Sequence, residues 1–159
     1  MSKNQYPSSW YRRIDWPVTL FLILNPLLTI IVLPFYFYEH GFSLSFFLLG
    51  ALMAAATNLA ITAGYHRLFA HRSFEAHPLI RFLFLWIGAS AFQGSALKWS
   101  SDHRRHHWKV DTEEDPYSIK KGFWYAHMGW MFLRESVDLP IQAADLEKDR
   151  LVAHQHRHY

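Results

Sequence analysis

The sequence contains no cysteine among its 159 residues, and this absence excludes several kinds of site. A chain without cysteine has no disulfide framework, no thiolate metal site and no catalytic thiol. Any metal that the protein holds must therefore be bound by histidine, aspartate or glutamate. Histidine is frequent for a chain of this length, with 11 copies, and the second half is rich in both charge and histidine.

Charged side chains are missing from two long stretches of the first half, residues 17–38 and 42–64. Each stretch has about the 20 apolar residues that a transmembrane helix needs. Pro26 and Pro34, in the interior of the first stretch, are compatible with a helix in a membrane. Only residues 39–41 separate the stretches, so we predict a transmembrane helical hairpin over about residues 17–64.

Two other interpretations of these stretches are a signal peptide and a pair of buried helices in a soluble domain. The first stretch is too long for a signal peptide, lacks a small-residue cleavage site and is followed at once by a second apolar stretch. Two uncharged stretches of bilayer length are also rare in so small a domain. The hairpin is therefore the favoured interpretation.

Basic residues flank the predicted hairpin on both sides, and its short connection has none. These residues are Lys3, Arg12 and Arg13 before it, and Arg67, Arg72 and Arg81 after it. The positive-inside rule then places both ends of the hairpin, and the histidine-rich second half, in the cytoplasm. The formal net charge is only +3, and the positively charged residues lie near the apolar segments. This pattern indicates that they face a membrane surface and not nucleic acid.

A third apolar stretch over residues 78–99 contains Arg81, Gln93 and Lys98. If it crossed the membrane, the later histidines would lie on the opposite side from the earlier ones. We therefore expect a helix in or along the cytoplasmic interface. The predicted fold is all-α: a membrane hairpin, an interfacial helix over about 78–99, and a cytoplasmic histidine-box region over about 100–159.

The histidines form two clusters. His66 and His71 are five residues apart, and five residues turn through about 140° of a regular α-helix, so the pair converges only where a helix ends or bends. His103, His106 and His107 have offsets that place all three on one helical face, with the intervening arginines, Arg104 and Arg105, pointing away. Converging neutral imidazoles suit iron, copper, zinc and nickel.

The ligand types narrow the choice of metal. Five histidines exceed the roughly four ligands of one zinc site, and the Glu-x-x-His pairs of a carboxylate di-iron bundle are absent from the sequence. A pair of oxygen-activating metals with mainly imidazole ligands fits better. The alternative for the second cluster is a solvated basic helix that touches lipid phosphates.

Two strings resemble the first and second histidine boxes of the membrane fatty acyl desaturases: GYHRLFAHRSF at residues 64–74 and WSSDHRRHH at residues 99–107. Residues 58–64, 91–93 and 122–130 are also similar to that family. The resemblance covers the chain from about Asp15 onward and is specific to the stearoyl-CoA (Δ9) desaturase-like branch.

The resemblance implies an oxygen-dependent enzyme that introduces a cis double bond, at Δ9, into a saturated acyl chain. It implies two non-haem iron ions and a separate electron donor protein, such as a ferredoxin, a rubredoxin or a b-type cytochrome. It also assigns roles to residues. The implied iron ligands are His66, His71, His103, His106 and His107. The implied substrate-binding residues are Gln93 and Trp99, at the bend of an acyl tunnel, and Asp102 and Arg134, near the thioester head group.

The sequence departs from the family pattern in several places. Animal acyl-CoA members typically have Asn, Arg and Lys where this chain has Gly94, Ser101 and Glu135, so an acyl-CoA and an acyl-lipid substrate both stay open. Family members continue with a second hairpin and a His-x-x-His-His box. We therefore expect residues 1–159 to be the N-terminal part of one desaturase domain. The alternating histidines of 154–158 do not reproduce that third box, and we expect them to be solvated or interfacial.

Three other functions are compatible with parts of this pattern. A related di-iron membrane hydroxylase or alkane oxygenase would share the metal chemistry. An inactive fragment lacking the third box would bind metal without turnover. A membrane haem protein would need histidines facing each other from two spans, and the uncharged stretches contain none. The role of His127 is open between structural packing and support of a metal ligand.

Overall fold

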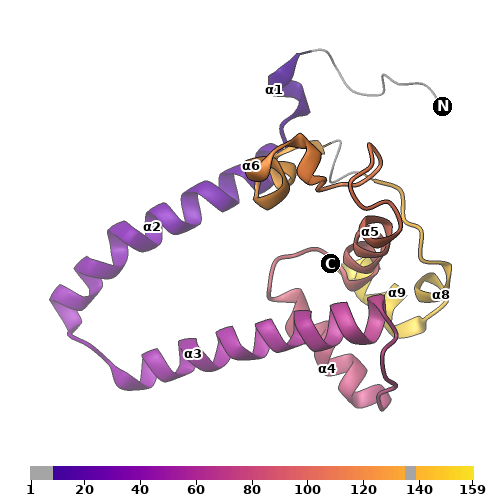
Figure 1. Ribbon diagram of the computed structural model, residues 1–159. Coiled ribbons are helices and arrows are strands. Elements are labelled where there is room, and N and C mark those ends of the chain that lie inside the picture. Colours follow the sequence, from indigo (N-terminus) through magenta and orange to yellow (C-terminus); the bar gives the residue numbers. More distant parts are fainter. Residues whose placement is uncertain (1–8, 135–138) are drawn as a thin grey trace. The chain divides into compact units, whose positions relative to one another are not determined.

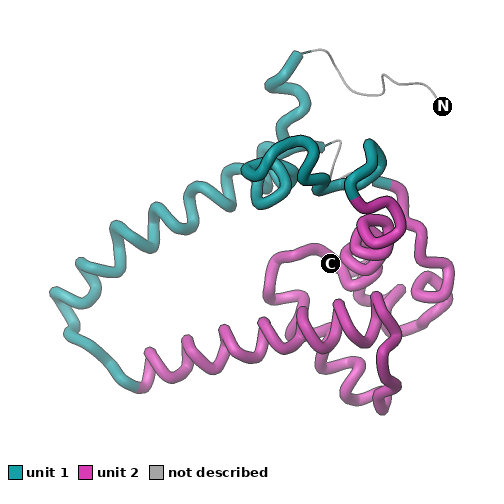
Figure 2. Tube along the Cα trace, in the orientation of Figure 1, with its two compact units in different colours: residues 1–44, 111–139 teal, residues 45–110, 140–159 magenta. Residues whose placement is uncertain are grey.

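The computed structural model describes residues 9–134 and 139–159 (Figure 1). Within these ranges the regular structure is helical, and a single isolated bridge between Ile14 and Leu133 is the extent of β pairing. The all-α prediction is confirmed. The chain divides into two compact units, residues 1–44 with 111–139 and residues 45–110 with 140–159 (Figure 2).

The first unit contains the long helix α2, Trp16–His40. Asp15 caps its N-terminus by accepting a hydrogen bond from the Val18 amide, and a proline follows in the first turn, where no amide donor is needed. Among the described residues, the unit also contains the short helices α1 (Trp10–Arg13), η2 (Ile119–Lys121), α6 (Phe123–His127) and η3 (Gly129–Phe132). The Asp15 amide donates to the carbonyl of Phe132 in η3, which joins the two ends of the unit.

The second unit begins with α3, Leu44–Leu59, which continues without a break into the π-helix η1, Ala60–Ala70. Its remaining helices are α4 (Pro78–Ala89), α5 (Ala96–Trp108), α8 (Ala144–Glu147) and α9 (Arg150–His158). α4 and α5 both pack on η1, and α9 packs on α4 and α5. The histidines of both predicted clusters lie in this unit.

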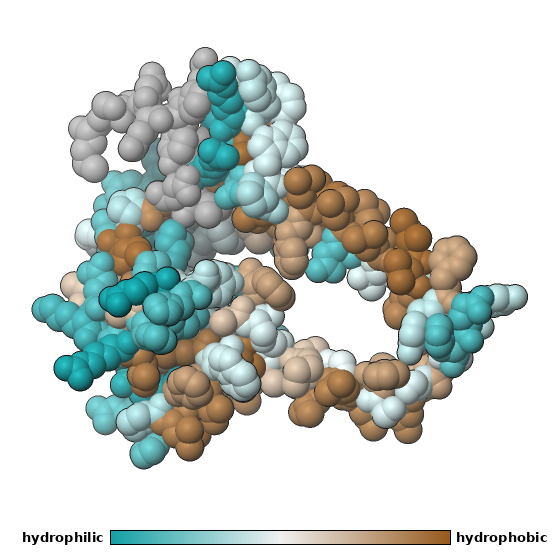
Figure 3. Space-filling view, turned by 180° about the vertical axis from the view of Figure 1, so that it is seen from behind, coloured by the Kyte–Doolittle hydropathy of each residue, from teal (hydrophilic) through white to brown (hydrophobic). Residues whose placement is uncertain are grey.

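Two helices are long and apolar enough to cross a membrane, Trp16–His40 with 25 residues and Leu44–Ala70 with 27. At 1.5 Å per residue, the first is roughly 38 Å long, more than the roughly 30 Å of a bilayer core. Large apolar side chains along it are exposed, for example Ile30 at 69% and Phe35 at 68%. Apolar residues gather along both long helices (Figure 3). The predicted spans thus exist as helices, whereas their packing as a hairpin stays a prediction.

The structure corrects the single helix expected over residues 78–99. α4 ends at Ala89 and α5 begins at Ala96, so the chain turns between them. Phe92 and Gly94 adopt positive φ angles of 54° and 85°, which no helix accommodates. Ser95 then starts α5 by accepting a hydrogen bond from the Lys98 amide. The prediction of one helix was wrong because Gly94 takes part in a turn and Ser95 caps a new helix.

The core of the second unit surrounds η1. Tyr65 is fully buried, and its hydroxyl accepts a hydrogen bond from the amide of Gln155 on α9. Its ring lies against Gly88, where a Cβ would come within 2.5 Å of it. Other buried members of this core are Leu68, Phe69, Leu85, Leu97, Leu146 and Val152. The helix that carries the first histidine cluster is therefore fixed by packing on several sides.

Candidate metal centre

The first pair of histidines meets because the chain leaves α3 through a π-helix. In a π-helix each amide bonds to the carbonyl five residues earlier, so residues five apart lie one turn apart. The His71 amide donates to the His66 carbonyl at 2.9 Å. The two Nε2 atoms are consequently 3.1 Å apart. The predicted convergence at a helix end is therefore found, through a helix type that the sequence did not indicate.

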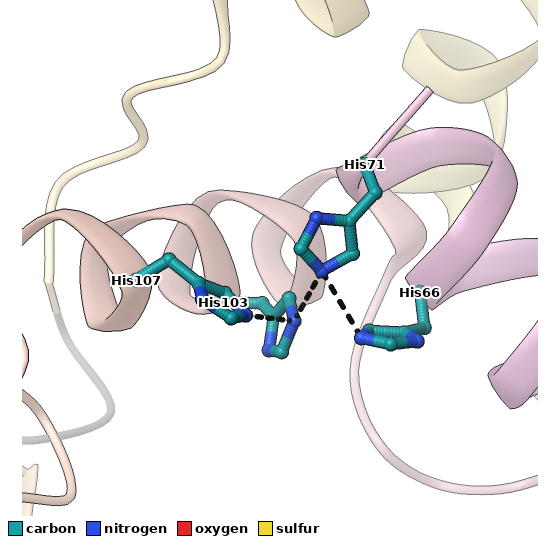
Figure 4. Close-up of side chains that lie close together, drawn as sticks. All are labelled: His66, His71, His103 and His107. Atoms are coloured by element: carbon teal, nitrogen blue, oxygen red, sulfur yellow. Dashed lines mark hydrogen bonds between the residues drawn. The ribbon is translucent and has the colours of Figure 1, made fainter. Parts of the chain in front are cut away.

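The second pair, His103 and His107, occupies successive turns of α5, and their Nε2 atoms are 3.1 Å apart. His71 joins the two pairs, because its Nε2 lies 3.0 Å from that of His103 (Figure 4). One ligand atom from each of His66, His71, His103 and His107 lies within 4.8 Å of the other three. Residues 32 positions apart in the sequence thus direct their ring nitrogens at one point.

His106, the fifth predicted ligand, is not in this group. Its ring centroid lies 6.4 Å from that of His103 and 5.6 Å from that of His107. Its ring therefore lies near the cluster, at an edge of it. Its role as a ligand stays a prediction.

Burial and neighbouring imidazoles keep the centre of the cluster uncharged. Burial, followed by the effect of His107, His66 and the other histidines, lowers the pKa of His103 to about 3. Burial and the adjacent His66 also lower the pKa of His71. Both rings are therefore neutral at pH 7, which is the form that coordinates a metal.

The donor set fits a transition metal. Four neutral imidazoles converge, and within the described part of the chain no carboxylate joins their group. His71 and His107 are exposed while His66 and His103 are half-buried, so the cluster is open on one side. Imidazole ligands suit iron, copper, zinc and nickel. The geometry supports a metal centre, and the open side leaves room for further ligands or a substrate.

Of the predicted substrate-binding residues, Trp99 contacts this cluster and Gln93 contacts Trp99. The Trp99 ring stacks on the imidazole of His103, with centroids 4.9 Å apart and an interplanar angle of 25°. The Trp99 indole N–H donates to the Gln93 side-chain oxygen at 3.1 Å. Gln93 lies in the turn between α4 and α5, so the corrected helix boundary is what brings it to Trp99.

The other two predicted substrate residues lie in different units. Asp102 pairs with Lys98 one turn earlier on α5, and burial raises the pKa of Asp102 despite that ammonium group. Arg134 is exposed and belongs to the first unit. Glu135, which the sequence comparison singled out, lies outside the described residues.

Residues 42–158 match the family model described as fatty acid desaturase. The chain belongs to the fatty acid desaturase family. Acyl-CoA desaturase 1 of Saccharomyces cerevisiae is 35% identical over 96% of this chain and 30% of its own length. The icosanoyl-CoA 5-desaturase of Limnanthes douglasii is 42% identical over 82% of this chain and 35% of its own length. The acyl-CoA Δ12-desaturase of Acheta domesticus is 38% identical over 70% of this chain and 33% of its own length. The chain spans about a third of the length of these relatives.

The desaturase chain also uses polar residues that the sequence did not reveal. Arg104 and Arg105, expected to point away from the histidine face, are half-buried and buried. Arg104 bonds to the end of η1 and to Asp145, and Arg105 donates to the Pro140 carbonyl. No local pattern links these partners, because residues 140–145 follow α5 by more than 30 positions. Only the fold brings them together.

The remaining histidines of this desaturase chain have structural contacts. His77 caps α4 by accepting from the Leu79 amide, and the exposed His127 ring stacks on Phe123. His154 and His158 are exposed, as expected, and contact each other. His156 is exposed as well, and its Nδ1 lies 2.7 Å from the Ser95 hydroxyl that caps α5.

Proposed function

We propose that this chain carries the first two histidine boxes of a membrane fatty acyl desaturase, which introduces a cis double bond into a saturated acyl chain with dioxygen. The observation that carries the proposal is the convergence of His66 and His71 with His103 and His107. Four imidazole nitrogens from two separate helices that meet at one point form a donor set that suits a transition metal. Relatives named as acyl-CoA desaturases support the reaction class.

We propose two iron ions as the cofactor. The four clustered histidines would hold them together with His106, and further ligands would come from a third box outside residues 1–159. Bound iron would activate dioxygen, and dioxygen is the oxidant that takes up the two hydrogens of the unactivated acyl chain and is reduced to water. A separate protein, such as a ferredoxin, a rubredoxin or a b-type cytochrome, would supply the electrons.

Trp99 and Gln93 are proposed to position the acyl chain beside the metals. The indole of Trp99 offers an apolar face, and its hydrogen bond to Gln93 fixes the turn that follows α4. Asp102 and Arg134 are proposed to lie near the thioester head group, where a guanidinium can pair with a phosphate. The relatives named above favour acyl-CoA over an acyl-lipid substrate, and we propose Δ9 as the site of desaturation from the resemblance of the boxes.

Product analysis tests the reaction. The full-length protein, expressed with an electron donor and supplied with a saturated acyl chain, is expected to yield a cis-monounsaturated product detectable by gas chromatography and mass spectrometry. Removal of iron with a chelator is expected to stop the reaction, and added ferrous iron to restore it. A hydroxylated product would instead establish the related membrane hydroxylase, which shares the metal chemistry.

We also propose that Trp16–His40 and Leu44–Ala70 both cross the membrane, with the histidine boxes in the cytoplasm. Because the sequence has no cysteine, single cysteines introduce clean labelling sites. In right-side-out vesicles, a membrane-impermeant maleimide is expected to label His40→Cys, at the end of α2, without permeabilisation. Glu75→Cys, an exposed position after η1, is expected to react only after permeabilisation. The reverse pattern would invert the proposed orientation, and equal labelling of both would exclude it.

A further inference from the structure

Arg104 lies between the ligand histidines of the second box, yet its side chain reaches the end of the helix that carries the first. Its Nε donates to the Ala70 carbonyl at 2.9 Å, and its Nη2 donates to the Phe69 carbonyl at 2.7 Å. These carbonyls belong to the last turn of η1, where helix geometry leaves acceptors without partners. A cation at that end is also favoured by the helix dipole.

Asp145 on α8 holds the same guanidinium from the other side. Arg104 forms two parallel bonds to it, Nη1 to Oδ1 at 2.7 Å and Nη2 to Oδ2 at 3.1 Å. Arg72, next to His71, bonds to the same carboxylate. Although burial acts in the opposite direction, these bonds hold the pKa of Asp145 well below its usual range. Both partners are therefore ionised, and charge-assisted bonds of this bidentate kind are among the strongest in proteins.

We infer that Arg104, clamped by Asp145, is the positioning residue that sets the separation of the two histidine boxes. The inference rests on the proposed metal centre and extends it. Arg104 follows His103 directly, and Ala70 directly precedes His71, so the Arg104–Ala70 bond runs beside the 3.0 Å contact between those two imidazoles. A shift or rotation of α5 against η1 breaks several bonds of one planar group at once.

The side chain acts through the backbone and touches no ligand atom, which separates it from the ligands themselves. Its contacts also explain why arginine is needed. A lysine carries the same charge, but its single ammonium does not reproduce a planar fork that binds two carbonyls and a carboxylate together. The spacing of the boxes therefore depends on the shape of the guanidinium in addition to its charge.

Titration with Co²⁺, followed by visible absorption, tests this inference in the purified protein in detergent. Arg104→Lys, Arg104→Met and Asp145→Asn are each expected to raise the Co²⁺ dissociation constant roughly 10- to 100-fold, the usual cost of losing support for a metal ligand set. Their spectra at saturation are expected to differ from that of the wild type. Glu147→Gln removes an exposed carboxylate from the same helix α8 and is the matched control, expected to match the wild type.

The variants separate geometry from charge. By charge alone, Arg104→Met removes a positive group and would tighten cation binding, whereas the positioning role predicts weaker binding. Circular dichroism before each titration establishes that the helices are intact, and Arg104→Lys, which keeps charge and bulk, is the mildest change. A different result would be Arg104 variants that unfold at a lower temperature while their Co²⁺ dissociation constant and their Co²⁺ spectrum match those of the wild type. That result would limit Arg104 to a role in stability and overturn the inference. A wild-type protein that binds no Co²⁺ would remove the metal centre itself, and the inference with it.

Discussion

His103→Ala is expected to abolish metal binding and all desaturase activity of the full-length protein. His103 is the middle of the cluster: its Nε2 lies 3.0 Å from that of His71 and 3.1 Å from that of His107, and its ring centroid lies 4.6 Å from that of His66. Its loss leaves three imidazoles without the one that links both boxes. The ring also stacks on Trp99, so the variant disturbs the proposed acyl-chain contact as well.

Metal content by atomic emission spectroscopy and product formation measure this effect, with His106→Ala as the informative comparison. If the four clustered residues alone form the site, His106→Ala retains its metal. If the family resemblance assigns the ligands correctly, His106→Ala loses part of the metal and the activity. Full metal content in purified His103→Ala would contradict the site as the structure presents it.

Gly88→Ala is expected to lower the free energy of unfolding by about 1–3 kcal/mol, the usual cost of overpacking a core. The added Cβ would lie 2.5 Å from Cε1 and 2.8 Å from Cζ of the Tyr65 ring. That ring is fully buried and its hydroxyl is bonded to Gln155, so it has little room to move. Because Tyr65 precedes His66 directly, the change is also expected to weaken metal binding.

Thermal unfolding in detergent, followed by circular dichroism, measures the loss of stability. Gly50→Ala in α3 is the matched control, because a Cβ there meets no atom of the described residues within 4 Å. Alanine is the better helix former by about 1 kcal/mol, so the control is expected to unfold at or above the wild-type temperature. A Gly88→Ala variant that unfolds with the control would show that η1 and α4 pack less closely than the structure indicates.

The sequence by itself determined which segments are apolar and which residues offer metal ligands. Residues 17–38 and 42–64 carry no charge. Each of these stretches is long enough for a helix that crosses a bilayer, so their length predicts two such helices. The one-turn spacing of His103 and His107 needs only helical geometry to bring both rings to one face. The family resemblance of the two boxes followed from the same residues and required no knowledge of their distance in space.

Only the tertiary structure decided how the two boxes meet. The five-residue spacing of His66 and His71 fits no α-helical face, and the π-helix that resolves it depends on packing of η1 against α4 and α5. The turn between α4 and α5, which places Gln93 beside Trp99, arises from positive φ angles that hydrophobic periodicity does not encode.

The clamp of Arg104 between η1 and Asp145 joins residues 34 to 41 positions apart. Local patterns report the helices in which residues sit, whereas contacts at such separations depend on how those helices pack. The sequence thus identified the candidate ligands, and only the fold showed that four of them converge.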